Sequence, residues 1–490
     1  MDRVDTAFDA LQGRLGPALE LSQPGRDDEH VMVALPSFSL GESLLSHYGD
    51  RIPALEHRYL LAMLVLNRVA CDLVLVVCQA PTPEVVDYYL SLIRPERRAA
   101  ARARLHVLEV PDPSHRSIAE KLLDRPDLID EVRGLIAGRP AYIEPWNVSD
   151  SEVAVALALD APINGSSPRL WPLGFKSAGR QLFKEAGVPV PAGCGDVRTI
   201  DDVLAAIAAV RRARPHVSAV VIKHDDSGAG DGNRVIDLRT PGDLRATLEG
   251  LPEWYLRDLA DGAVVEELIT GTRFTSPSVQ FDVLPDGRVV LLATHEQVMG
   301  GEGGQVYMGC RFPADPAYAA ELARLGRAVG QRLAARGVLG RASVDFAAAR
   351  DQRGVWHLHA LEVNLRKGGT THPYAALRNV APGHYDEAAG RWLTTDGSTR
   401  AYLATDNLVD PSWKGVPPGR VIDHVAAAGL QLDPASGLGV VLHMLSCLAI
   451  DGRLGLTAIG RTAEEAADLY EAAGLAVASA ARQGAEGTRH

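Results

Sequence analysis

The chain has few cysteines and no long run of basic or apolar residues. Its 490 residues include five cysteines, and none belongs to a C-x-x-C pair. Scattered cysteines in an odd number indicate reduced thiols in a cytoplasmic protein, without a disulfide framework or a sulfur-bound metal. No apolar run approaches the roughly 20 residues of a membrane span, and the first residues lack the basic-then-apolar pattern of a secretion signal. We therefore expect a cytoplasmic protein that does not bind membranes.

Positive charge is also scarce. The net charge of −12 and the lack of a basic run argue against nucleic-acid binding. Of the 50 basic residues only six are lysine, which suggests that lysine is kept where a compact ammonium suits better than a planar guanidinium. The length exceeds one hydrophobic core, and 46% hydrophobic residues provide material for two or three domains.

The first third of the chain alternates strand-like and helix-like segments. Helices are expected at 54–69 and 82–93, and apolar strands at 31–36, 72–78, 104–110 and 141–146. Strands separated by segments of helix length predict a doubly wound parallel sheet. The segment 161–174, which contains proline and serine, is typical of a linker.

The middle of the chain has a different pattern. A turn signal at 285–287 lies within a series of expected strands, at 218–225, 234–238, 263–269, 278–284 and 288–296. This portion is therefore expected to be largely antiparallel. An amphipathic helix is expected at 317–337, and a hairpin across 350–354. A short α/β tail follows, with a strand within 439–450 and a helix at 462–473.

The hairpin carries the strongest chemical signal. Glu362 and Asn364 alternate on a strand, so their side chains share a face, and pairing across the hairpin would add Asp345. Oxygen ligands of this kind suit Mg²⁺, and the positive Arg366 and Lys367 that follow directly are expected to bind the nucleotide triphosphate. The alternative is a polar strand face that is merely solvated.

Three weaker signals precede the hairpin. Lys223 ends an apolar strand before a loop with Ser227, Gly228 and Gly230, which can hold phosphate or can be a flexible turn. Lys176 opens a helix, where a structural lysine is the alternative. The strand at 263–271 can offer its backbone to an adenine edge, with Glu266 near the amino group; surface glutamates are the commoner explanation.

The order of these signals resembles the ATP-grasp superfamily over residues 171–380. The resemblance implies ATP and Mg²⁺ as cofactors, held between two α+β subdomains. It implies that Lys176 and Lys223 contact phosphates, that the glycine loop closes over them, and that the metal ligands are Asp345, Glu362 and Asn364. The adenine site would comprise Glu266, Glu267 and Ile269. The chain departs from the pattern at Arg273, where many members carry a ribose-binding glutamate; Glu267 is a candidate for that contact.

Longer stretches, among them ALPSFSLGESLL, THEQVMGGEGGQVYMGCRFPA and NLRKGGTTHP, are similar to the peptide ligases of the pheganomycin type. That likeness implies a Rossmann-like pre-ATP-grasp domain at 1–170, an ATP-grasp domain at 171–400 and a C-terminal extension at 401–490. It implies that a carboxylate is activated as an acyl phosphate and then attacked by an amine, in specialised peptide biosynthesis. The expected partners are an amino-acid-like or N-capped acid, an amino acid or peptide amine, and a second copy of the chain in a homodimer.

Further residues fit such a reaction. Arg366 and Lys223 would neutralise charge on the transferred phosphate. Arg311 could pair with a substrate carboxylate, and His295 or Glu296 could accept the proton of the amine. Structural roles are the alternative for these three. Two other functions also stay open: an ATP-grasp enzyme with another acceptor, which forms a thioester or phosphorylates a small molecule, and a nucleotide-binding regulatory protein.

Overall fold

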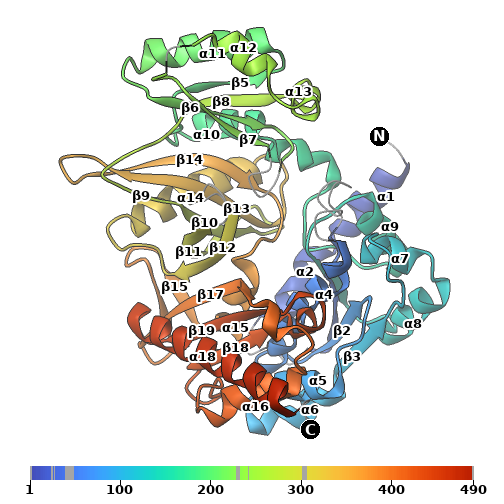
Figure 1. The fold of residues 1–490 in the computed structure, drawn as a ribbon. Coiled ribbons are helices and arrows are strands. Elements are labelled where there is room, and N and C mark those ends of the chain that lie inside the picture. Colours follow the sequence, from blue (N-terminus) through green and yellow to red (C-terminus); the bar gives the residue numbers. More distant parts are fainter. Residues whose placement is uncertain are drawn as a thin grey trace.

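The computed structural model describes residues 3–23, 26, 28–38, 49–227, 232–240, 242–300 and 306–487. Within them the strands form three sheets, arranged along the molecule as Figure 1 shows. Among these residues, no helix combines the length and the apolar character needed to span a bilayer.

The first sheet is parallel, as the sequence predicts. It contains β1 (His30–Leu35), β2 (Cys71–Val77), β3 (Leu105–Glu109) and β4 (Ala141–Pro145), in the order β3-β2-β1-β4. One face packs a separate apolar core with the helices α1 (Arg3–Gln12), α7 (Ile118–Leu123), α8 (Pro126–Ile136) and α9 (Asp150–Leu159). β1, β2 and β4 are largely buried on both faces, which explains their apolar sequences, whereas the edge strand β3 is only partly buried.

The helix expected at 54–69 takes another form. A single turn, α4 (Ile52–Leu55), leads into the 3₁₀ helix η2 (Glu56–Asn67). This segment packs against β2, α5 (Pro83–Ser91) and α15 (Thr371–Val380), so it has no solvated face. Its buried polar residues bind backbone instead: Glu56 accepts from the Cys78 N–H at 2.6 Å, and His57 Nε2 lies 2.8 Å from the Gln79 carbonyl oxygen.

The second sheet is small and antiparallel. Its strands are β5 (Gly193–Val197), β6 (Ala219–His224), β7 (Asn233–Asp237) and β8 (Ala263–Glu267), in the order β5-β8-β6-β7. The helices α11 (Ile200–Ala213), α12 (Leu244–Glu249) and α13 (Glu253–Leu259) lie on its outer side, while α10 (Lys176–Glu185) lies between it and the third sheet (Figure 1).

The third sheet has 11 strands. A path from β14 (Trp356–Asn364) continues through β13 (Gly340–Arg350), β10 (Pro277–Val283), β11 (Val289–Gly300) and β12 (Val306–Phe312). It then continues through β17 (Thr399–Val409), β16 (Arg391–Thr394) and β15 (Gly383–Asp386). Off this path, β9 (Arg273–Thr275) pairs with β13, and β19 (Arg453–Gly460) pairs with both β17 and β18 (Gly439–His443). The C-terminal strands therefore extend the same sheet through the β12–β17 pairing.

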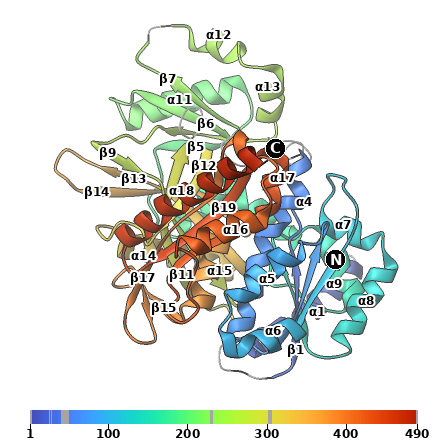
Figure 2. The ribbon, with the colours of Figure 1, turned by 60° about the horizontal axis from the view of Figure 1, so that its bottom comes forward.

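Helices cover the third sheet on both sides of its middle. α14 (Ala319–Ala334) packs on β10 and β11, whereas α15 lies between the sheet and η2. Figure 2 shows α18 (Ala463–Gly487) lying across β17 and β19, with α16 (Pro418–Ala427) beside it. The remaining short helices are α2 (Leu15–Leu21), α6 (Arg98–Ala103), α17 (Leu448–Asp451), η1 (Gly49–Arg51), η3 (Pro95–Arg97), η4 (Pro168–Gly174), η6 (Pro411–Trp413) and η7 (Leu445–Cys447).

Two contacts fasten the parallel sheet to the third sheet. The segment expected to be a linker forms bridges to both, through Ile163 with Ile143 and Gly165 with Gly340. Lys367 forms the second contact: its backbone N–H donates to the Trp146 carbonyl at 3.0 Å, and its Nζ lies 2.6 Å from Glu144 Oε1. Nζ also donates to the Pro145 carbonyl. Lys367 is buried, so the ammonium is fully engaged here.

This placement corrects the assignment of Lys367 to nucleotide binding. We expect Lys367→Ala to leave Glu144 without its partner and to lower the free energy of unfolding by on the order of 3 kcal/mol, as for other broken buried ion pairs. Nucleotide affinity should change little. Thermal unfolding and titration with ATP would measure the two quantities.

The exposed Lys414, whose side chain makes no hydrogen bond or ion pair with the described residues, provides the matched control. Lys414→Ala should leave the melting temperature unchanged. A Lys367→Ala protein with wild-type stability and lost ATP binding would restore the nucleotide role and contradict ours.

Candidate active site

One large cavity lies where the three sheets meet. It has a volume of about 900 Å³, which is within the range of sites that enclose a cofactor or substrates. One wall is formed by β6 and the end of β8, and another by the face of the third sheet that β13 and β14 form. The remaining walls come from the N-terminal unit, by which we mean the parallel sheet with its helices, η1 and η2, and from the C-terminal strands β17 and β19. Each wall comes from a different part of the chain.

The floor of the cavity holds the predicted oxygen cluster. The β13–β14 hairpin forms as expected and pairs Asp345 with Glu362 and Ser343 with Asn364. The amide of Asn364 donates to Asp345 Oδ2 at 3.1 Å, and the amide of Gln297, on β11, donates to Asp345 Oδ1 at 2.8 Å. Asp345, Glu362 and Asn364 all line the cavity.

The electrostatics of this cluster suit a cation. Burial and the negative charge of Glu362 raise the pKa of Asp345 to about 7, while Arg366 acts in the opposite direction. Two carboxylates held side by side away from water repel each other, and a divalent cation between them removes that cost. Carboxylate and amide oxygens are the ligands that Mg²⁺ prefers, so the donor set fits this ion. Arg366 lines the same cavity.

Lys176 links this cluster to the loop after β6. Its Nζ donates to the Ser227 carbonyl at 2.7 Å and to Ser227 Oγ at 3.0 Å, and lies 3.6 Å from Glu362 Oε1. The side chain is buried and lines the cavity. Gly228 and Gly230, predicted in the same loop, lie outside the described residues.

Lys223 and Glu266 form a buried ion pair. Lys223 Nζ lies 3.0 Å from Glu266 Oε2, and Arg180 Nη1 donates to Glu266 Oε1 at 2.5 Å. Lys223 lines the cavity, but Glu266 does not. This corrects the placement of Glu266 beside adenine: both of its oxygens are taken, and it serves as the counter-ion of Lys223.

The end of β8 supplies the wall opposite the oxygen cluster. Glu267, Leu268 and Ile269 line the cavity there. One oxygen of Glu267 accepts from the Ala192 N–H at 2.7 Å, and the other lies 3.3 Å from Arg214 Nε. Arg273 is exposed and stacks on Trp356 with its guanidinium carbon 5.7 Å from the ring centroid.

Three predicted catalytic residues do not line the cavity. His295 is fully buried, with Nε2 at 2.5 Å from the Tyr402 hydroxyl, and burial lowers its pKa to about 3. A base that weak is ineffective near neutral pH. Glu296 accepts from the Asp315 N–H at 3.1 Å and from the Tyr318 hydroxyl, and the exposed Arg311 is its partner in the β11–β12 register.

These positions correct the proton-transfer and substrate-binding assignments of His295, Glu296 and Arg311. Alternation along β11 puts Glu296 on the opposite face from Gln297, and His295 is sealed by aromatic rings. The sequence alone could not show which of these three side chains faces the cavity, because all three residues lie close to the glycine-rich 300–305 segment.

The cavity also has a wall that the sequence did not reveal. Side chains from the N-terminal unit and from the C-terminal strands line it: Phe38, Arg51, Arg58, Trp146, Asp406, Asn407 and Arg453. Phe38 lies within the ALPSFSLGESLL stretch, but no sequence pattern shows that these residues line one wall, since they meet only in the folded chain.

Comparisons with known proteins identify the family to which this chain belongs. The family model described as PGM1 C-terminal domain matches residues 420–473. The L-propargylglycine–L-glutamate ligase of Streptantibioticus cattleyicolor is 34% identical over 433 residues, which cover 83% of this chain and 85% of that protein. The IQ motif-containing protein H of Danio rerio is 24% identical over 297 residues, 51% of this chain and 28% of that protein.

Solved structures share the fold. N5-carboxyaminoimidazole ribonucleotide synthetase in its ADP complex matches with a TM-score of 0.52 and 11% identity, over 91% of this chain and 96% of that one. The biotin carboxylase of Campylobacter jejuni, solved with a βγ-ATP ligand, matches with a TM-score of 0.53 and 16% identity, over 89% and 88%. Together with the ligase relative, which spans most of both chains, they show that this chain belongs to the ATP-grasp peptide ligases, which join a carboxylate to an amine.

Proposed function

We propose that the chain binds ATP with Mg²⁺ in this cavity and uses it to make a peptide bond. The observation that carries the proposal is the meeting of an oxygen cluster with two buried lysines from other elements in one cavity. Asp345, Glu362 and Asn364 would hold the metal, and Lys176 and Lys223 would contact phosphates. A metal bound there supplies positive charge to the phosphate oxygens.

The adenine fits the wall at the end of β8. Glu267, the last residue of β8, and Ile269, which lies just beyond the strand, line it. Arg366 lies beside the oxygen cluster, where the γ-phosphate would be. Glu267 keeps its assignment as a candidate ribose contact, although Ala192 and Arg214 already engage both of its oxygens.

The reaction follows from the placement of these charges. An oxygen of the acid substrate attacks the γ-phosphorus, and the bond to the β-phosphate oxygen breaks, which releases ADP and leaves an acyl phosphate. The amine then attacks the acyl carbon, inorganic phosphate departs, and the amine loses a proton to solvent or phosphate. The residues contribute position and charge neutralisation, because several negative groups must approach each other.

The substrate classes come from the ligase relative. Its name joins L-propargylglycine to L-glutamate, so both of its substrates are amino acids. We therefore propose an amino acid or N-capped amino acid as the acid, an amino acid or short peptide as the amine, and a place in natural-product biosynthesis.

ADP release should require both an acid and an amine. A screen of amino acid pairs, with ADP measured by a coupled assay and products by mass spectrometry, tests this. Release with an acid alone at the full rate would point instead to phosphorylation of a small molecule. A thiol-dependent product would indicate thioester formation, and nucleotide binding without turnover would indicate a regulatory protein.

Loss of one metal ligand should abolish turnover without unfolding the chain. We expect Asn364→Ala and Glu362→Gln to lower kcat by about 10²- to 10³-fold, as when one preorganised group is removed from a charged transition state. Circular dichroism and the melting temperature should match the wild type.

His357 provides a control on the same strand, because its exposed side chain pairs only with Asp351 among the described residues. His357→Gln should retain full activity. Wild-type turnover in either ligand variant would contradict the assignment of the metal site.

A further inference from the structure

Three arginines gather in the wall that the sequence did not reveal. Arg51 comes from η1, Arg58 from η2 and Arg453 from β19, and all three line the cavity. We call them, together with Phe38 and Trp146, the arginine lobe. The carboxylates near them in the described chain are Asp406, paired with Arg58, and Asp451, which lies 3.2 Å from Arg453 Nε and 4.0 Å from Arg51 Nη1. Arg58 and Arg453 thus each have one of these carboxylates beside them.

Arg58 is the most constrained of the three. Its Nε lies 2.9 Å from Asp406 Oδ2, and its guanidinium carbon lies 5.7 Å from the Trp146 ring centroid and 5.9 Å from that of Phe38. Among the described residues, Asp406 is its only ion-pair partner. The Asp406 carboxylate and the two rings therefore confine the guanidinium while its side chain lines the cavity, and a guanidinium placed in this way can bind a carboxylate.

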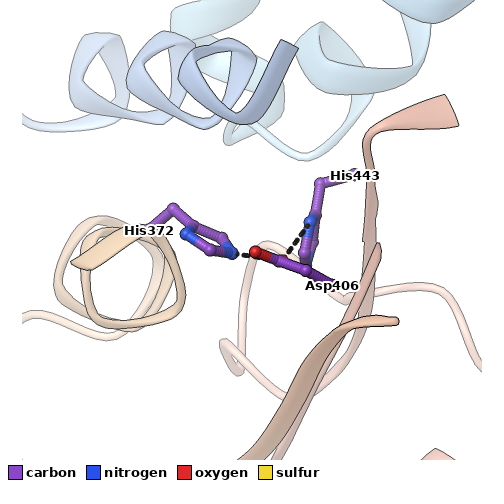
Figure 3. Close-up of side chains that lie close together, drawn as sticks. All are labelled: His372, Asp406 and His443. Atoms are coloured by element: carbon purple, nitrogen blue, oxygen red, sulfur yellow. Dashed lines mark hydrogen bonds and ion pairs between the residues drawn. The ribbon is translucent and has the colours of Figure 1, made fainter. Parts of the chain in front are cut away.

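Asp406 lies beside two histidines, as Figure 3 shows, and among the described residues His372 is the one that forms a hydrogen bond with it. His372 Nε2 lies 2.7 Å from Asp406 Oδ1, and His443 Nδ1 lies 3.5 Å from the same oxygen. Burial acts to raise the pKa of Asp406, but the charge of Arg58 and the bond to His372 outweigh it, so the net shift is downward. Burial lowers the pKa of His443 to about 3, so this ring is neutral.

The same three residues have the geometry of a metal site, since their ligand atoms lie within 4.8 Å of one another. The charges argue against a metal. Arg58 already neutralises Asp406, so a divalent cation would add two further buried positive charges without a second carboxylate. The cluster is better suited to fix the direction of Arg58 than to bind an ion.

We propose that the arginine lobe binds the unreacting carboxylate of the amine substrate, with Arg58 as the contact and Asp406, His372 and His443 as positioning residues. This inference rests on the proposed function. In peptide-bond formation the acid substrate loses its charge at the reacting carbon, near Arg366. An amino acid that acts as the amine keeps its own carboxylate throughout, and a cavity that encloses it must supply a positive partner.

The lobe also has a suitable position. It shares one continuous cavity with the oxygen cluster, and the backbone of 368–370 lines the space between Arg366 and the C-terminal strands. An amine bound here by its carboxylate would share this cavity with the acyl phosphate formed beside the oxygen cluster. The aromatic wall of Phe38 and Trp146, whose ring centroids are 4.9 Å apart, excludes water beside Arg58.

The test compares an amine substrate with its carboxamide, which keeps the shape and the nucleophile but removes the charge. With a productive pair from the amino acid screen, wild-type kcat/KM should fall at least 10-fold for the carboxamide. Arg58→Gln should lower kcat/KM for the free acid by a similar factor, mainly through KM, and should erase the preference. Arg58→Lys should restore part of it.

Arg68 offers a matched control at the end of η2. Its Nη1 donates to the Arg378 carbonyl at 2.6 Å, and it does not line the cavity. Arg68→Gln should keep the preference for the free acid. Asp406→Asn should weaken the preference in the same direction as Arg58→Gln, while stabilisation of the protein by ATP and Mg²⁺ shows that each variant is folded.

Equal use of acid and carboxamide by the wild type, or a preference that survives Arg58→Gln, would overturn the inference. So would a preference that depends on the acid substrate instead of the amine. Binding of the amino acids, measured by calorimetry without turnover, separates the two proposals. If the amino acid binds only when Arg58 is present but no ADP is released, the assignment of the arginine lobe holds and the ligase reaction is refuted. If turnover occurs and does not depend on Arg58, the ligase reaction holds and the assignment of the lobe is refuted.

Discussion

The register of the β13–β14 hairpin is the constraint on which the site depends. It places Asp345 opposite Glu362 and brings Asn364 to the same face, with Gln297 of β11 completing the set. A slip of one residue would turn these groups toward the opposite face of the sheet. Two neighbouring carboxylates are unfavourable in a protected cavity, as the raised pKa of Asp345 shows. The folded sheet holds them there because α10 packs on β14 and the buried apolar residues of β13 and β14 fix the register independently of the charges.

The lysine side chains also occupy specific, enclosed positions. Four of the six lysines are buried: Lys121, Lys176, Lys223 and Lys367. Lys223 and Lys367 each face a dedicated carboxylate, and Lys176 is tied to the Ser227 backbone and lies near Glu362. A compact ammonium can be enclosed in this way with few partners, whereas a guanidinium needs more donors satisfied. The scarcity of lysine in the sequence therefore did point to constrained positions, although Lys367 fastens two parts of the chain and does not bind nucleotide in our assignment.

The fold and the oxygen cluster were accessible from sequence because they depend on local periodicity. Continuous apolar runs predicted the parallel sheet, and the spacing of Glu362 and Asn364 predicted a shared face. The alternation of side chains along a strand does not reveal which face of the sheet lines the cavity. His295 and Glu296 are neighbours beside the same loop, yet one is sealed beneath Tyr402 and the other lies toward Tyr318. The sequence likewise suggests that Glu266 is accessible at the end of a strand, but its carboxylate is bound by Lys223 and Arg180, which are 43 and 86 positions away.

The arginine lobe was out of reach for a related reason. Arg58 precedes its partner Asp406 by 348 positions, and its local sequence does not show that the two residues pair. The β12–β17 pairing and the packing of α15 on η2 bring the two together. This division has a physical consequence. The proposed metal and phosphate ligands stand on β13, β14, α10 and β6, while the lobe stands where the parallel-sheet region meets the C-terminal strands. Side chains of the lobe can therefore change without disturbing the register that holds Asp345 and Glu362. In our assignment, specificity for the amine and use of ATP are separable properties of one cavity.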